Sequence, residues 1–200
     1  MGIKEKFNSI LVSLGLKKEN EEQEDNRVRP EDVVYNDNIQ GEFFGVPFGA
    51  TVEEVIEGFA KHNLFPTKDS TTDHIKFHGK LHENGISFDN LSFGGFSWNE
   101  VSVSFSNRCF YSIFFIEKYN DKEKAMYNWA TVSEKLNNVY RMYGVKPLFQ
   151  NNHVTECGLG KDGRRVTLDC SSFLTQAENI WTCVRLNYQD KNFYTENNEL

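Results

Sequence analysis

Apolar and polar residues alternate along much of the chain between residues 75 and 116. Val101, Val103 and Phe105 are each followed by a serine. This period of two places the apolar side chains on one face of a strand and the serines on the other. Residues 109–116 (CFYSIFFI) are apolar on both faces of a strand, which predicts a central strand of the sheet.

Similar patterns predict further strands on both sides of these two. Residues 75–81 alternate between apolar and polar side chains, and residues 86–93 form the next strand after Asn84-Gly85, a dipeptide that favours a hairpin turn. Asp162-Gly163 marks a second turn in the last third of the chain. The strands predicted there span residues 148–156, 164–170 and 180–188.

Two amphipathic helices are predicted from apolar residues at spacings of three and four. Thr51 and Glu54 form a capping-box motif, in which each side chain binds the backbone amide of the other residue. The first helix is therefore expected at residues 52–63. Asn120 is the expected N-cap of the second helix, whose apolar stripe runs to Tyr143 and is followed by a glycine.

The order of the predicted elements is helix, four strands, helix and three strands. Runs of strands separated by single helices are typical of an α+β fold. We expect an antiparallel sheet of about seven strands with two helices on one face, arranged as two helix-plus-meander units. The single folded domain is expected to span residues 39–190.

The segments outside this domain differ from it in composition. Residues 3–16 have apolar side chains at helical spacing, which predicts a separate amphipathic helix within residues 1–16. Residues 17–38 are charged and nearly free of apolar side chains, which predicts a flexible linker. Residues 191–200 form a polar tail.

The N-terminal helix leaves two interpretations open. Its apolar face docks onto the domain or a partner protein, or else the helix lies on a membrane surface, where four nearby lysines would meet anionic lipid. The apolar run at residues 10–16 is too short to span a bilayer, and no signal-peptide cleavage site follows it. The expected location is therefore the cytoplasm.

The overall charge argues against nucleic acid as a partner. The chain of 200 residues has a net charge of -7 and an isoelectric point of about 5.3. Nucleic-acid binding requires a basic surface that neutralises phosphates, and the sequence has no dense Lys/Arg cluster. The four cysteines contain no Cys-x-x-Cys pair, so they are expected to be buried reduced thiols.

The sequence contains no recognisable catalytic, cofactor-binding or metal-binding motif. His74, His78 and His82 are spaced by four, but residues four apart on a strand lie ~13 Å apart, too far to share one metal ion. The Gly-rich stretch before residue 164 has Thr155 where a phosphate-binding loop needs its first glycine. We therefore expect a protein that is not an enzyme and uses no cofactor.

Two short motifs resemble bacterial proteins with β-lactamase-inhibitor-protein-like repeats, a repeat shared with small outer-membrane assembly lipoproteins. Residues 44–49 (FGVPFG) followed by the helix from Thr51 are similar to the entry to the first helix of that repeat. Trp129, Tyr140 and residues 143–147 (YGVKP) are similar to the second repeat. The resemblance covers residues 42–188 and implies protein binding through a sheet face, with no catalytic residues.

An aromatic cluster around two glycines is the candidate binding site. Residues 88–98 (FDNLSFGGFSW) include Phe88, Phe93, Phe96 and Trp98, which form either part of the core or an exposed patch of the kind enriched in protein interfaces. We expect a non-enzymatic module that binds a partner protein through its sheet face. The alternatives are a membrane-peripheral protein held by residues 3–16, and an enzyme or small-ligand binder whose site is not visible in the sequence.

Overall fold

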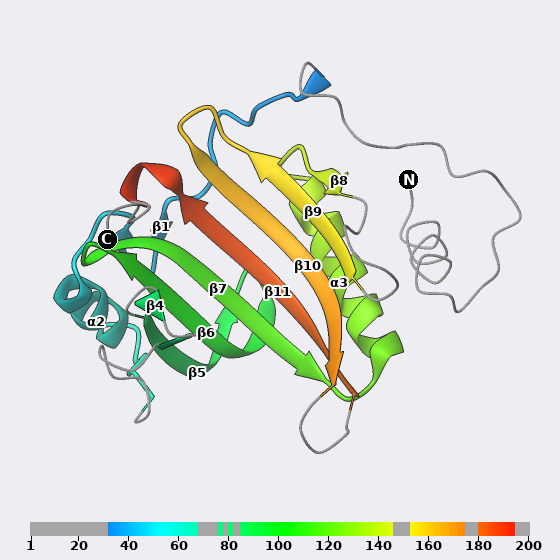
Figure 1. Ribbon diagram of the computed structural model, residues 1–200, viewed down its shortest axis with the longest axis horizontal. Helices are drawn as coiled ribbons and strands as arrows, with labels where there is room; N and C mark the ends of the chain where they lie inside the picture. Colours follow the sequence, from blue (N-terminus) through cyan, green and yellow to red (C-terminus); the bar gives the residue numbers. More distant parts are fainter. Residues whose placement is uncertain are drawn as a thin grey trace, which may run out of the picture.

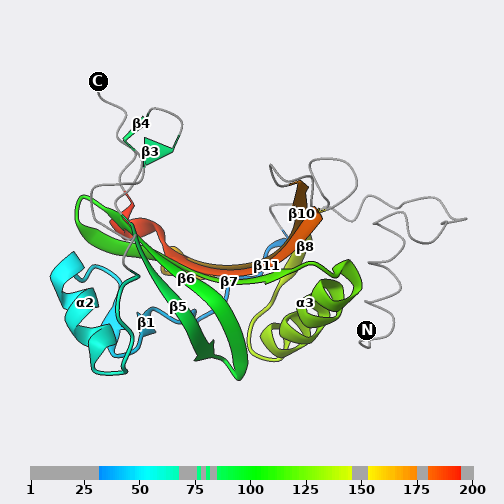
Figure 2. The ribbon, with the colours of Figure 1, turned by 90° about the horizontal axis from the view of Figure 1, so that it is seen from below.

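The computed structural model describes residues 32–67, 76–77, 80–81, 85–145, 153–174 and 180–194. These residues form a seven-stranded antiparallel sheet with both helices on one side of it (Figure 2). The predicted α+β class is therefore confirmed. The predicted N-terminal helix and the histidines considered as metal ligands lie outside the described residues.

The two strand meanders of the sequence meet in the middle of one sheet. The strands follow the order β5-β6-β7-β11-β10-β9-β8 (Figure 1). β7 lies between β6 and β11, so the apolar run at its start is an interior strand, as predicted. The bounds of the strands are Gly85–Phe93 (β5), Phe96–Ser106 (β6), Cys109–Tyr119 (β7), Tyr143–Val145 (β8), His153–Leu159 (β9), Arg164–Leu174 (β10) and Ile180–Asp190 (β11).

Two short hairpins accompany the sheet. β1 (Glu42–Phe43) pairs with β2 (Val46–Pro47), and β3 (Lys76–Phe77) pairs with β4 (Lys80–Leu81). The second hairpin corrects the prediction of a single strand at residues 75–81, because the pairing of Phe77 with Lys80 reverses the chain between them.

The hairpin turn predicted at Asn84-Gly85, ahead of β5, falls partly outside the described residues, because Asn84 is not among them. Gly85 is the first residue of β5, and the turn between β5 and β6 is made by Gly94 and Gly95. These two glycines have φ angles of 64° and 79°. Two successive positive φ angles are what a tight hairpin turn requires, and glycine adopts them without strain.

Helix α2 (Val52–Ala60) begins with the predicted capping box. Thr51 Oγ1 accepts a hydrogen bond from the Glu54 amide at 3.3 Å, and Glu54 Oε2 accepts one from the Thr51 amide at 2.8 Å. The helix ends at Ala60 instead of residue 63. It buries Val55 and Phe59 completely under the sheet.

Helix α3 (Lys122–Asn137) starts and ends at different residues from those predicted. Asp121, not Asn120, is the N-cap, and its side chain accepts hydrogen bonds from two amides of the first turn. The helix stops at Asn137, well before Tyr143, which belongs to β8. The apolar stripe misled the prediction because Tyr140 continues it from a loop position, where it is buried in the same core.

Residues 34–37, assigned to the linker by their composition, contact the edge of the sheet. The Asn36 amide donates to the carbonyl of Leu159 at 2.7 Å, and Asn36 Oδ1 accepts from the Arg141 amide at 2.7 Å. Val34 bonds the Tyr143 hydroxyl. At the other end, residues 191–193 of the predicted tail form a short 3₁₀ helix. Polar side chains bind both segments, so hydrophobicity alone misplaced these boundaries.

Loss of the capping box will destabilise the domain without changing its fold. We expect Thr51→Ala to lower the free energy of unfolding by about 1 kcal/mol, because the Glu54 amide loses its acceptor. The measurement is urea unfolding followed by the fluorescence of the buried tryptophans. Thr51→Ser keeps the hydroxyl and should lie close to the wild type; equal losses in both variants would contradict this account.

Candidate functional site

The sheet face turned away from α2 and α3 is the candidate site, and we call it the helix-free face. In Figure 2, β7, β10 and β11 bow so that this face is concave. The strand register shows which side chains of this face are neighbours, because residues paired across adjacent strands form rows that cross the sheet. Its central rows are Ser104, Ser112, Gln189, Arg165 and Leu159; then Ser102, Phe114, Asn187, Thr167, Cys157 and Tyr143; then Glu100, Ile116, Arg185, Asp169 and Thr155.

This face arises directly from the alternation of the strands. In β7, Ile113 and Phe115 are fully buried under the helices, whereas Phe114 and Ile116 point to the other face and are half-buried. In β6 the serines that alternate with the buried valines lie on the helix-free face. The face therefore has small polar side chains toward β6 and larger side chains from β7 to β9.

A charged pair lies at the centre of the helix-free face. Arg185 Nε donates to both carboxylate oxygens of Asp169 at 3.1 Å, and its Nη2 donates to Asp169 Oδ2 at 2.7 Å and to Ser171 Oγ at 3.0 Å. The Asp169 side chain is 14% exposed and that of Arg185 is 42% exposed. Burial by itself lowers the pKa of Arg185. The hydrogen bonds to Asp169 and the negative charge of that carboxylate raise it, so the pKa of Arg185 lies above its ordinary value.

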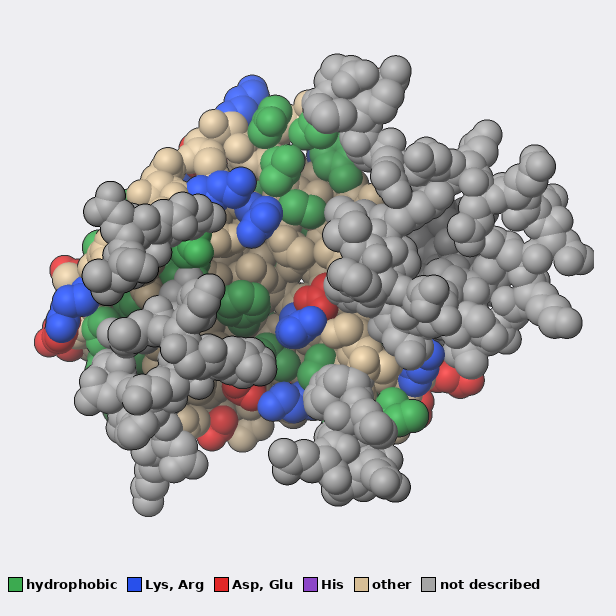
Figure 3. Space-filling view, in the orientation of Figure 1, with side chains coloured by type: hydrophobic (Ala, Val, Ile, Leu, Met, Phe, Trp, Pro, Cys, Tyr) green, Lys and Arg blue, Asp and Glu red, His purple; other side chains and the backbone are tan. Residues whose placement is uncertain are grey.

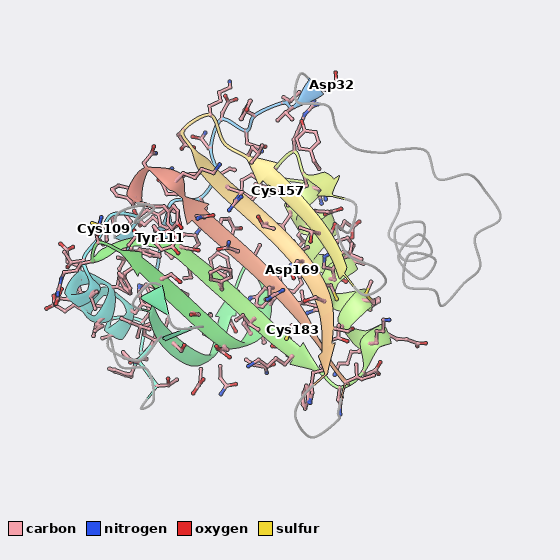
Figure 4. All side chains as sticks on the ribbon, in the orientation of Figure 1. Asp32, Cys109, Tyr111, Cys157, Asp169 and Cys183 are labelled. Atoms are coloured by element: carbon pink, nitrogen blue, oxygen red, sulfur yellow. The ribbon has the colours of Figure 1, made fainter. Side chains whose placement is uncertain are left out.

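The thiols on and below this face are poor nucleophiles. Cys157 and Cys183 lie on the helix-free face, and burial raises the pKa of each thiol. Cys170 lies in the core with its sulfur 3.6 Å from that of Met126, and burial raises its pKa to about 12. Figure 4 shows Asp169 between Cys157 and Cys183 along the sheet. Within the described residues, no group of three His, Cys, Asp or Glu side chains is arranged to hold a metal.

The predicted aromatic cluster does not form an exposed patch. Phe88 and Trp98 are only 0% and 1% exposed, so the structure places them in the core. Phe93 is half-buried and stacks on Phe115 with ring centroids 4.1 Å apart. Phe96 is half-buried beneath the Lys135 ammonium, 4.4 Å from the ring centroid. The cluster therefore joins the β5–β6 hairpin to the core.

Sequence reasoning missed the apolar and arginine side chains that do lie on the helix-free face. The signal for two of them was present, because strict alternation from Ile113 puts Phe114 and Ile116 opposite the core. Their neighbours Arg185 and Asn187 come from β11, which is distant in sequence. That pairing was not readable from the chain, since it depends on strand order.

A second concavity lies beside α2. It has a volume of about 530 Å³ and is lined by residues 45–50, the exposed side of α2 and Phe193. Glu54, at its edge, is bound to the Thr51 amide in the capping box. The residues that line this groove include no His, Cys or Ser side chain that could serve as a base or a nucleophile.

Comparisons of the chain with family models, with curated proteins and with solved structures gave no match. Among the described helices, neither is long and apolar enough to cross a membrane. The function must therefore be argued from the side chains of the helix-free face.

Removal of the central carboxylate will cost more stability than removal of a surface one. We expect Asp169→Ala to lower the free energy of unfolding by about 1–2 kcal/mol, because Arg185 keeps its charge but loses its carboxylate acceptor and retains only the Ser171 hydroxyl among the described residues. Glu53, which pairs with Arg108 at 2.6 Å on the exposed surface, is the matched control. Glu53→Ala should leave the urea midpoint close to that of the wild type, because an exposed ion pair is screened by water. A similar loss in both variants would contradict the ranking.

Thiol reactivity will follow the raised pKa values. A raised thiol pKa means that less thiolate is present at pH 8, and the thiolate is the reacting species. We expect Cys170 to be alkylated by iodoacetamide at pH 8 only after denaturation, because its pKa is about 12 and its side chain is buried. Peptide mass spectrometry of native and denatured samples measures this. Rapid native labelling of Cys170 would show that the core is open at β10.

Proposed function

We propose that this protein is a non-enzymatic module that binds a partner protein through the helix-free face. The observation that carries the proposal is the set of half-buried apolar and arginine side chains in the concavity of the sheet, with Phe114, Ile116 and Arg185 adjacent to one another. Large aromatic residues and arginine are enriched in protein interfaces, and a few of them supply most of the binding energy.

The shape and stiffness of this face favour a protein ligand over a small molecule. Its side chains stand on six neighbouring strands and spread across the sheet instead of converging on one pocket. Strands held by cross-strand hydrogen bonds on both sides move little, so a partner would meet a preformed surface. Figure 3 shows hydrophobic groups interspersed with Lys and Arg groups over the described part of this face.

The groups required for catalysis are not brought together by the described residues. The carboxylate of Asp169 is held by Arg185, and the thiols nearby have raised pKa values. A nucleophile needs a base within hydrogen-bonding reach, or a lowered pKa. The resemblance to proteins with β-lactamase-inhibitor-protein-like repeats supports the same proposal, because it implies binding through a sheet face.

Site-specific photo-crosslinking tests the proposal. We expect benzoylphenylalanine at position 114 to crosslink a partner protein in cells, since it replaces a half-buried phenylalanine on the helix-free face. The same group at Tyr127, which is 63% exposed on α3, is the control and should capture nothing at matched expression.

The captured protein is then purified and its affinity measured. We expect Ile116→Asp to weaken binding by about tenfold or more, because a charge would be placed against a desolvated contact. Tyr127→Asp should leave the affinity unchanged. Circular dichroism serves as the control that both variants are folded. Crosslinking at position 127 but not at position 114 would reject the proposal.

A further inference from the structure

Arg165 is the unusual charge on the helix-free face. It lies in β10, between Gln189 of β11 and Leu159 of β9, and its side chain is half-buried. Its Nη2 donates to Gln189 Oε1, which is a neutral acceptor. Its Nε is enclosed by protein and has no hydrogen-bond partner in the part of the chain that the structure describes. Among the described residues, the half-buried guanidinium of Arg165 therefore has a neutral acceptor, Gln189 Oε1, and an N–H group at Nε that donates to no acceptor.

The neighbouring arginines show how different this is. Arg185 has Asp169 as a partner, and Arg164, on the core side of β10, has Asp162 and Asp190. Within the described residues, no carboxylate oxygen lies within salt-bridge distance of Arg165. An uncompensated charge that is partly removed from water is costly, and an arriving carboxylate would offset that cost.

Two cations, Arg165 and Lys191, act on the corner of the face around Cys157. Burial raises the pKa of the Cys157 thiol, while hydrogen bonding from Thr167 and the charges of Arg165 and Lys191 act in the opposite direction. Both cations therefore act on the same region. Figure 3 shows Lys and Arg groups gathered over the upper ends of β10 and β11.

We propose that the partner bound by the helix-free face presents a carboxylate from an acidic polypeptide segment to Arg165. This inference rests on the proposed function and names the chemistry of its partner. A carboxylate accepts two parallel hydrogen bonds from a guanidinium, and it can draw the group away from Gln189 so that Nε gains an acceptor. Partly desolvated arginines of this kind are frequent energetic centres of interfaces.

The chemistry of the rest of the chain favours a polypeptide carboxylate over a nucleic-acid phosphate. The chain has a net charge of -7, and Asp169 and Glu100 lie on the same face. A long polyanion at Arg165 would extend to these acidic side chains and be repelled by them, whereas a short acidic segment can contact Arg165 without reaching Glu100. The apolar side chain of Phe114, one register row from Arg165, also suits a polypeptide.

Nuclear magnetic resonance of the full-length chain tests this chemistry. The probe is a hexaglutamate peptide at low ionic strength, and the readout is the Arg165 Nε–H resonance together with backbone amides of β10 and β11. We expect saturable shifts that disappear in Arg165→Gln and persist in Arg108→Gln, whose guanidinium is exposed and paired with Glu53 elsewhere. Hexaglutamine should give no shift.

Three results would overturn the inference. One is a hexaglutamate affinity that Arg165→Gln leaves within about twofold of the wild type. Another is tighter binding of inorganic phosphate than of hexaglutamate at Arg165, which would indicate a phosphorylated partner. The third is a shift of Arg165 in the unliganded chain when the acidic residues at 19–25 are changed to amides, which would identify the chain itself as the occupant.

The partner captured at position 114 separates this inference from the proposed function. We expect Arg165→Gln to lower the affinity for that partner by about tenfold, and a lysine-for-glutamate change in the partner to restore binding to Arg165→Glu. Unchanged affinity of Arg165→Gln would refute the carboxylate site while the proposed function stands. Specific hexaglutamate binding with no crosslink at position 114 would refute the proposed function while the carboxylate site stands.

Discussion

The aromatic layer between the sheet and α2 is the packing contact on which the rest of the structure depends. Phe43 lies in the middle of this layer, with its ring 5.5 Å from that of Phe48, 6.1 Å from that of Phe115 and 5.1 Å from that of Tyr188. These rings join the segment before α2 to β7 and β11. Because β7 and β11 come from different meanders, the layer holds the two halves of the sheet together.

Burial of one sheet face determines the character of the other. Every interior strand places alternate side chains under the helices, so the remaining side chains must lie on the helix-free face. The serines of β6, Arg165 of β10 and Arg185 of β11 are there because the residues that alternate with them are buried valines and leucines. The proposed binding surface is thus a consequence of the same alternation that builds the core.

The two arginines of this surface differ in the acceptors that their guanidinium groups have. Arg185 has a carboxylate and a hydroxyl as acceptors, which fixes the position of its guanidinium. Arg165 has a neutral amide oxygen and an unsatisfied Nε. The first arginine stabilises the sheet, whereas the second retains charge that a ligand can use. This difference could not be read from the sequence, in which both residues are arginines within predicted strands.

The sequence by itself determined the strand and helix types, the capping box at Thr51 and the interior position of β7, because these depend on local periodicity and on neighbouring residues. Tertiary structure decided where α3 ends, since Tyr140 joins the core from a loop, and it decided that Phe88 and Trp98 are buried. It also decided which residues share the helix-free face. The pairing of β7 with β11 brings together segments far apart in the chain, and local patterns carry no information about such pairing.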